Sequence, residues 1–327
     1  MRKKMALGTV LVLLAAGLWF WSAGGAGSKR QITIGVLQFT ANNLTTLDGF
    51  KAGMEELGYR EGENVRYVFD GPAATRSELD MKMAELLGAQ PDLVFTSPTP
   101  ATLIAQQATR TSRIPVVFAP VNDPVAAGIV SDIRNPGENV TGIRLAASDG
   151  KRLQWLKEIS PSLSKVFLPY NAAGKSALTS YGNAKAAAEA LGVELIGRPV
   201  RSVEEIRAAM EEIDEDVDAI FLPRDGMVMS RIKEFVALTT ERRIMLSTPR
   251  LKQVQQGALT GYGFIGFELG KQAARLADKI LKGADPGTLP IETAEDYLFV
   301  NLGTADAIGI PIEDHILRQA RDVIRPD

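Results

Sequence analysis

Polar side chains able to hydrogen-bond a small ligand follow the apolar segments in the first part of the chain. Gln38 closes the segment 32–39, Ser97 and Thr99 follow the segment 92–96, and Asn122 follows the segment 115–119. Thr99 also opens a helical pattern at 100–111, and the free backbone N–H groups of a helix start suit a carboxylate. The same residue fits equally well as an N-cap before a proline, and one side chain can serve both roles.

A matching set of polar residues occurs in the second part of the chain. Asn171 follows the segment 165–170, and Arg224 and Asp225 follow the segment 218–222. Asp225 suits a ligand ammonium group, while Arg224 or Arg144 suits a two-pronged contact with a carboxylate. Tyr262 suits an aromatic wall of the site. Two simpler alternatives stay open: Arg224 points into solvent, and Tyr262 packs between lobes.

The stretch 114–143 carries one wall of the predicted site. Its segment 115–119 is apolar throughout, which is typical of a strand buried on both faces within a parallel sheet. Asp123 follows that strand and precedes a proline and a short apolar helical segment, so it is either a ligand contact at the sheet edge or a cap for that helix. Capping is the preferred interpretation, with Asn122 as the ligand contact.

Composition excludes several functional classes. The 327 residues contain no cysteine and a single histidine, which excludes cysteine nucleophiles, disulfides and clusters of histidine ligands. A net charge of -2 offers no broad cationic surface for nucleic acid. Dinucleotide-type and P-loop glycine patterns are both missing. We therefore expect a protein that is not an enzyme and needs no cofactor.

The beginning of the chain predicts export. A basic start is followed by an uncharged run at 5–23 and then by small residues. The run is long for a cleaved signal peptide and just long enough to span a bilayer, so residues 1–28 are either an export signal or an N-terminal membrane anchor. Both alternatives place the rest of the chain in the periplasm or another extracytoplasmic space.

The remaining chain alternates short apolar runs with helical patterns. This alternation predicts an α/β fold with two doubly wound parallel-sheet lobes. Strands are expected at 32–39, 64–69, 92–96, 115–119, 165–170, 193–199, 218–222, 244–247 and 297–301. Helices are expected at 44–57, 77–88, 100–111, 150–159, 176–191, 203–213, 228–240 and 266–281, with a last one from about 312.

The chain is predicted to cross between the two lobes three times. The expected crossings lie near 139–144, 261–265 and 289–293. They define a first lobe of residues 29–142 plus 263–288 and a second lobe of residues 143–262 plus 289–327. No long Gly/Ser linker separates the lobes, so a short three-segment hinge should join them into a clamshell with its site in the cleft.

An ordered set of short motifs between 32 and 310 resembles the ABC-transporter substrate-binding proteins of the tryptophan/tyrosine-uptake type. The motifs are Ile34-Gly35-Val36-Leu37-Gln38, Gly49-Phe50 with Glu56-Leu57-Gly58-Tyr59, Gly62-Glu63-Asn64-Val65, Thr99-Pro100-Ala101, Asn122-Asp123-Pro124-Val125, Asn139-Val140-Thr141-Gly142, Tyr170-Asn171 and Pro223-Arg224-Asp225. The resemblance implies a type I periplasmic-binding-protein fold, a cleft that closes on a small amino-acid-like ligand, and delivery to an ABC permease driven by a separate ATPase.

Three departures from the family pattern bear on the ligand. Lys175 lies in a run where the family usually has Gly-Glu-x-Asn-Ser, Arg224 and Gly226 flank Asp225 where the family often has Thr-Asp-Asn, and Asn122 replaces a usual threonine. A glutamate and an asparagine are lost and two cations are gained. We therefore expect a ligand more acidic than an aromatic amino acid, or another small carboxylate.

The leading hypothesis is thus an exported, monomeric solute-binding component of an ABC importer. In it, Thr99 and its helix start hold a carboxylate, Asp225 holds an amino group, and Gln38, Asn122 and Asn171 orient the ligand. The alternative is a membrane-anchored extracytoplasmic sensor module, in which the closed clamshell signals to a membrane partner instead of feeding a permease.

Overall fold

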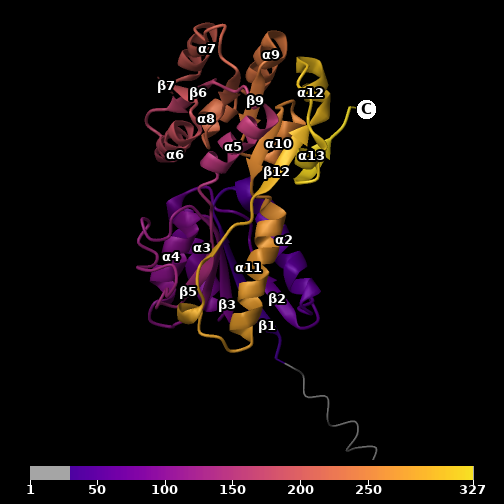
Figure 1. Cartoon of the computed structure of the whole chain (residues 1–327). Helices are drawn as coiled ribbons and strands as arrows, with labels where there is room; N and C mark the ends of the chain where they lie inside the picture. Colours follow the sequence, from indigo (N-terminus) through magenta and orange to yellow (C-terminus); the bar gives the residue numbers. More distant parts are fainter. Residues whose placement is uncertain (1–29, 327) are drawn as a thin grey trace, which may run out of the picture.

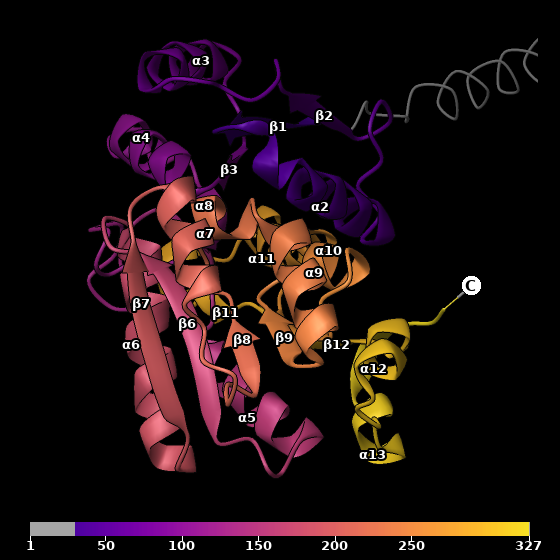
Figure 2. The same ribbon diagram turned by 90° about the horizontal axis from the view of Figure 1, so that it is seen from above.

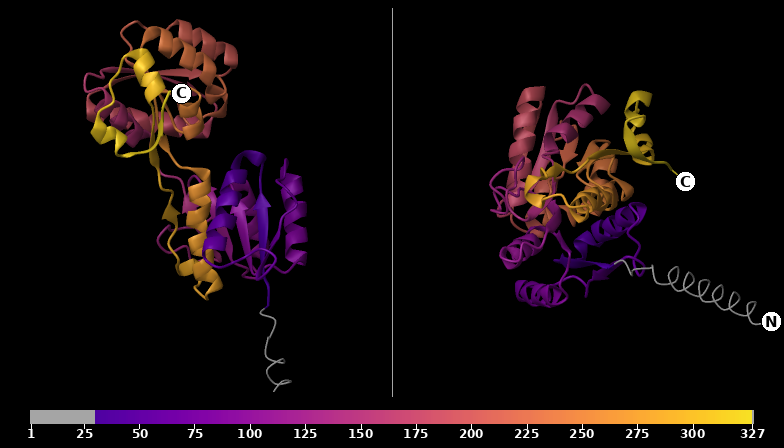
Figure 3. Two further views of the ribbon diagram at one scale, coloured as in Figure 1. Left: turned by 90° about the vertical axis from the view of Figure 1, so that its right-hand side faces the viewer. Right: turned by 90° about the horizontal axis from the view of Figure 1, so that it is seen from below.

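Two β-sheets, each covered by helices on both faces, organise the chain into two α/β lobes joined at a narrow waist (Figures 1 and 3). The computed structural model describes residues 30–326. The predicted export segment, residues 1–28, lies outside these residues. Within 30–326, no helix combines the length and the apolar character that crossing a membrane requires.

The first sheet has the strand order β11-β5-β4-β3-β1-β2, and every neighbouring pair is parallel. Its strands are β1 (Ile32–Gln38), β2 (Val65–Val68), β3 (Leu93–Ser97), β4 (Val116–Val121), β5 (Val140–Arg144) and β11 (Glu292–Thr293). All residues of β3 and β4 are buried, as expected for central strands covered on both faces. The predicted parallel sheet is confirmed.

Side-chain alternation along β1 divides the first lobe into two cores. Ile34 and Val36 pack with α2 (Leu44–Glu56) and α11 (Gly266–Leu281), while Leu37 packs on the opposite face with α3 (Arg76–Gly88) and α4 (Thr99–Thr109). The Thr75 hydroxyl accepts a hydrogen bond from the backbone N–H of Glu78 and so begins α3. Short 3-10 turns at Ala41–Asn43 and Pro286–Thr288 complete this lobe.

The second sheet has the order β13-β12-β10-β9-β8-β6-β7. Its strands are β6 (Lys165–Asn171), β7 (Glu194–Val200), β8 (Ala219–Phe221), β9 (Met245–Thr248), β10 (Thr260–Gly263), β12 (Tyr297–Asn301) and β13 (Ala320–Ile324). Pairs from β7 to β10 are parallel, whereas β12 runs antiparallel to β10 because the chain re-enters this lobe from the hinge side. The second lobe is therefore parallel apart from the β12 and β13 edge.

Helices cover both faces of this sheet as well (Figure 2). One core joins the sheet to α5 (Asp149–Ile159), α6 (Lys175–Leu191), α12 (Leu302–Ile308) and α13 (Asp314–Leu317). The other joins it to α7 (Val203–Glu211), α8 (Gly226–Met229) and α9 (Ile232–Arg242). The short α10 (Leu251–Gln255) follows β9.

The chain passes between the sheets at 145–148, 264–265 and 294–296. These positions differ slightly from the predicted lobe boundaries. β5 continues to Arg144 and β11 pairs with β5, so residues 143–144 and 292–293 belong to the first sheet, whereas Gly263 ends β10 in the second. Pairing extends to the last residue before each crossing because an unpaired backbone group near the interior would cost free energy.

Other predicted elements differ more. The helix expected at 228–240 is two helices, α8 and α9, which meet at Ser230 and Arg231. The final helix expected from about 312 is replaced by α13 and β13, because residues 320–324 extend the sheet alongside β12. Residues 124–130 form hydrogen-bonded turns where a short apolar helix was expected.

The closest helix contact in the first lobe depends on glycine. α2 and α11 lie side by side (Figure 1), and a Cβ atom on Gly270 would sit 2.0 Å from the carbonyl oxygen of Thr46. A Cβ on Gly49 would sit 1.9 Å from the carbonyl oxygen of Phe267. Backbone atoms cannot rotate away as side chains can, so both helices need glycine here.

We expect Gly270→Ala to destabilise the protein by about 2 kcal/mol or more, since overpacking a rigid contact typically costs 1–3 kcal/mol. The matched control is Gly182→Ala within α6, where an added Cβ has no atom within 4 Å. That change should stabilise the protein by up to about 1 kcal/mol, through helix propensity. Urea unfolding of both variants measures the difference, and equal effects would contradict the proposed backbone contact.

Candidate ligand-binding cleft

The carboxyl ends of the strands in both sheets point at the other lobe. β5 leads from its carboxyl end into the first crossing, and the other strands of its sheet run parallel to it. β10 likewise leads into the second crossing, with β6 to β9 parallel to it. Ligands bind outside the carboxyl ends of strands in open α/β sheets, so we expect the ligand site between the two opposed edges.

Two predicted residues lie side by side on the first lobe's edge. Gln38 ends β1 and Ser97 ends β3, and the two are direct partners in the parallel register. Gln38 is 1% exposed and Ser97 0% exposed. Among the described residues, no partner is available to either amide atom of Gln38 or to the Ser97 hydroxyl. An unmatched buried polar group costs about 1–3 kcal/mol, so this pair is a candidate for ligand contact.

The remaining two first-lobe candidates lie close by at the same edge. Thr99 is the first residue of α4, and Pro98, rather than Thr99, holds the N-cap position. Asn122 is exposed directly after β4. The Asp123 carboxylate accepts hydrogen bonds from the backbone N–H groups of Val125 and Ala126, each 3.0 Å long. Asp123 therefore holds this turn, as the capping interpretation expected, although residues 124–130 after it form no helix.

Two of the second-lobe candidates hold their own loops. Asn171 Oδ1 accepts a 3.0 Å hydrogen bond from the backbone N–H of Ala173. Asp225 Oδ1 accepts a 2.9 Å hydrogen bond from the backbone N–H of Val228 and so begins α8. Each side chain keeps further polar capacity, because a carboxylate or amide has more hydrogen-bonding positions than one. Their ligand contacts stay predictions.

Arg224 does not simply point into solvent. Its guanidinium Nη2 donates a 2.6 Å hydrogen bond to the hydroxyl of Ser148, which lies in the first crossing. The Ser148 hydroxyl in turn hydrogen-bonds the carboxylate of Asp296 in the third crossing. One network thus joins the loop after β8 to two hinge segments. Arg144, the other predicted carboxylate partner, donates from Nε to Thr293 Oγ1 at 3.2 Å and holds the β5–β11 edge.

Sequence reasoning missed Ser148 and Asp296. Neither follows an apolar strand, and they are 148 residues apart in the chain, so only the crossing geometry brings them together. Burial raises the pKa of Asp296, and the nearby charge of Asp149 adds to the rise, while the Ser148 hydrogen bond and Arg224 oppose it. Burial and the charge of Asp296 also raise the pKa of Tyr262, the predicted aromatic wall, which packs partly buried against the second-lobe core.

A buried cation lies beneath the second-lobe edge. The guanidinium of Arg152, in α5, is 3.6 Å from the ring centre of Phe221 and 3.3 Å from the Asp149 carboxylate. Burial lowers the pKa of Arg152 to about 9, the charge of Asp149 opposes this, and Arg224 adds to it. The Arg224 guanidinium bonds the Ser148 hydroxyl and the Arg152 backbone N–H bonds the Ser148 carbonyl, so both arginines lie near the same edge.

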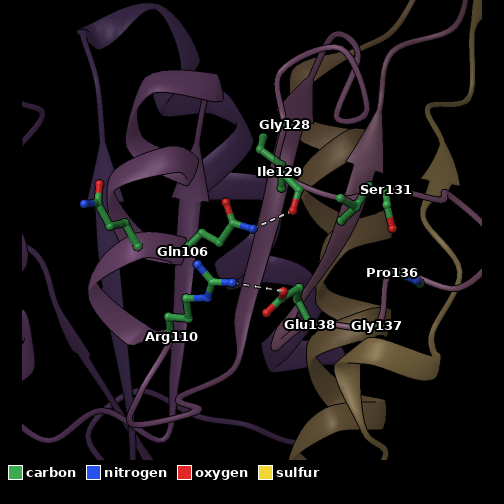
Figure 4. Close-up of a pocket in the computed structure, with 10 residues that line it drawn as sticks. Gln106, Arg110, Gly128, Ile129, Ser131, Pro136, Gly137 and Glu138 are labelled. Atoms are coloured by element: carbon green, nitrogen blue, oxygen red, sulfur yellow. Dashed lines mark hydrogen bonds and ion pairs between the residues drawn. The ribbon is translucent and has the colours of Figure 1, made fainter.

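A surface hollow of about 450 Å³ lies elsewhere, on the flank of the first lobe (Figure 4). Gln106 Nε2 donates to the carbonyl oxygen of Ile129 there, and Arg110 approaches Glu138 at 4.0 Å. Gln106 in α4 and Arg110 at its C-cap lie seven and eleven positions beyond Thr99, or about 10–17 Å along the helix. The sheet edges, and not this flank, carry the unpartnered Gln38 and Ser97.

Comparisons with known proteins agree with this geometry. The family model of ABC transporter substrate binding proteins matches residues 33–324, so the chain belongs to that family. The resemblance noted in the motifs is confirmed, as is the two-lobed clamshell fold. The role of this family is to bind a small solute.

Individual relatives extend over most of the chain. A tyrosine-binding protein of Clostridioides difficile (strain R20291) is 26% identical over 286 residues, covering 86% of this chain and 82% of the relative. An ABC domain from Streptococcus pneumonia, crystallised in complex with L-Trp, is 26% identical with a TM-score of 0.73, covering 90% of this chain and 100% of the other. A ligand-free, open substrate binding protein with adhesive properties from Clostridium difficile is 24% identical with a TM-score of 0.79, covering 91% and 100%.

We expect Asp296→Asn to stabilise the protein relative to wild type at pH 7 more than at pH 4. A raised pKa in the folded state means that the protonated carboxyl is favoured, so stability is lost as pH rises through the folded pKa. Asparagine cannot ionise and removes that loss. Urea unfolding at several pH values measures the effect, with the exposed Asp80→Asn as a control for the loss of one charge. A difference that shrinks towards pH 7 would contradict this account.

Proposed function

We propose that the chain is the extracytoplasmic solute-binding component of an ABC importer, and that it binds a small amino-acid-like or carboxylate ligand between its lobes. The observation that carries the proposal is the pairing of Gln38 with Ser97, whose buried polar atoms lack partners at the edge facing the second lobe. A ligand between the lobes supplies those partners when the clamshell closes.

Each end of the ligand has a suitable partner in the proposed site. Thr99 and the start of α4 receive a carboxylate, because free N–H groups and the helix dipole favour an anion there. Asp225 accepts from an ammonium group, Asn122 and Asn171 orient the ligand, and Tyr262 forms a wall. Relatives that are named for tyrosine or crystallised with L-Trp support an amino-acid scaffold.

The partners follow from the family. Closure brings the two lobes into the relative position that an ABC permease recognises. The protein needs no catalysis and no cofactor for this role. The protein acts as a monomer outside the cytoplasm, delivered by the segment 1–28 as a signal or anchor. Family membership favours this importer role over the anchored sensor. Mass spectrometry of the mature protein distinguishes a cleaved signal from an anchor.

The proposal is tested by isothermal titration and thermal-shift screening of the folded protein against the amino acids and small carboxylates. We expect saturable one-to-one binding by at least one compound, together with a raised melting temperature, because a ligand that binds only the folded state stabilises it. Absence of binding throughout the panel would refute the proposed ligand class.

We expect Gln38→Leu to weaken ligand binding roughly tenfold or more, since one hydrogen bond to a charged group is worth about 1.5–3 kcal/mol. The same change should leave the ligand-free protein at least as stable as wild type, because it removes two unpartnered buried atoms. Gln106→Leu, in the flank hollow, is the matched control and should leave affinity unchanged. Weakened binding by the control alone would place the site on the flank.

A further inference from the structure

Two identical Pro-Arg dipeptides leave neighbouring strands of the second lobe at the same level. Phe221 of β8 and Ser247 of β9 are register partners, and each is followed two residues later by proline and then by arginine. The sequences are Phe221-Leu222-Pro223-Arg224 and Ser247-Thr248-Pro249-Arg250. Because both strands are parallel, Arg224 and Arg250 emerge together at the carboxyl edge that faces the first lobe.

Among the described residues the two arginines lack ion-pair partners, although the charge of Arg224 opposes the rise in the pKa of the nearby Asp296. Within residues 30–326, neither guanidinium forms an ion pair, and Arg224 has only the neutral Ser148 hydroxyl as a partner. Among the nearby carboxylates, Asp149 is paired with Arg152 and hydrogen-bonded by Ser180, whereas Asp225 uses only Oδ1, for the N–H group that begins α8. Asp296, the remaining one, is partly buried and hydrogen-bonded to Ser148.

Mutual repulsion supports the close placement of these cations. Desolvation first, and the charge of Arg224 second, lower the pKa of Arg250, although the residue as a whole is exposed. Arg152 lies below the same edge, and the charge of Arg224 also lowers the pKa of Arg152. Like charges held at one edge without carboxylate partners are stabilised by an anionic ligand, and guanidinium groups bind carboxylates with two parallel hydrogen bonds.

We propose that Arg224 and Arg250 form a two-arginine clamp for an acidic group of the ligand, so that the ligand carries two anionic groups. This inference rests on the proposed function and names its substrate class: a dicarboxylate, with or without an amino group. One carboxylate meets Thr99 and the start of α4 in the first lobe, and the other meets the clamp in the second. The ligand then bridges the lobes electrostatically, and the contact at each end stabilises the closed state.

The test uses ligand pairs that differ by one charge at nearly constant shape. Titration calorimetry of the full-length protein compares L-glutamate with L-glutamine and L-aspartate with L-asparagine, and adds glutarate, succinate, L-tyrosine and L-tryptophan. We expect the acidic member of a pair to bind at least tenfold more tightly than its amide, and its affinity to fall with added salt because charge drives it. Glutarate and succinate show whether the amino group is needed.

Arg250→Gln is the informative variant, because the Arg250 side chain has no hydrogen bond or ion pair to another described residue and its loss should not disturb the fold. We expect it to weaken dicarboxylate binding roughly tenfold to a hundredfold, the value of one charged hydrogen-bonded contact. Binding of neutral amino acids should change little. Arg243→Gln is the matched control, since Arg243 precedes β9 and so lies at the opposite end of the strand that Arg250 follows.

Three results would overturn the clamp. The first is that amides or aromatic amino acids bind as tightly as the acids. The second is that Arg250→Gln and Arg224→Gln bind dicarboxylates with the same affinity as Arg243→Gln. In both cases the proposed importer role stands. A folded protein that binds no amino acid or carboxylate would overturn the clamp and the proposed function together.

Discussion

The structure depends on one geometric constraint: the chain crosses between its lobes three times, and each crossing joins the two sheets at the edge where their carboxyl-terminal strand ends lie. Parallel sheets place all such ends on one side. Because β5 and β10 both enter the hinge from their carboxyl ends, the loops of both lobes must face one another. A binding cleft follows from connectivity before any side chain is considered.

Polar groups at this cleft are held in two different ways. In the first lobe, Gln38 and Ser97 are buried by the sheet itself and lack partners among the described residues, so in the proposed site their hydrogen bonds go to the ligand. In the second lobe, Asn171 and Asp225 each accept a hydrogen bond from a backbone N–H group of their own loop. The first arrangement costs folding stability and the second fixes loop shape. Together they give a preorganised surface, which lowers the entropy lost on binding.

Sequence alone could predict most of the fold, since the alternation of apolar strands and amphipathic helices is a local signal. It also placed Gln38, Ser97 and Asn171 at the carboxyl ends of their strands, because each ends or directly follows an apolar run, while their contacts with a ligand stay predictions. The network of Arg224, Ser148 and Asp296 could not be found that way, because it joins segments far apart in the chain that meet only at the hinge. Strand β13 was missed for a related reason: residues 320–324 become a strand through pairing with β12, and not through their own pattern.

The shortness of the second crossing limits which sequence changes this architecture accepts. Residues 264–265 offer only about four soft backbone torsions, whereas surface loops usually accept insertions at small cost. One added residue there lengthens this crossing by up to about 3.5 Å, while the other two crossings keep their length. The lobes would tilt, and the opposed sheet edges would lose their alignment. Insertions and deletions among related chains should therefore occur in the outer loops and not in the three crossings.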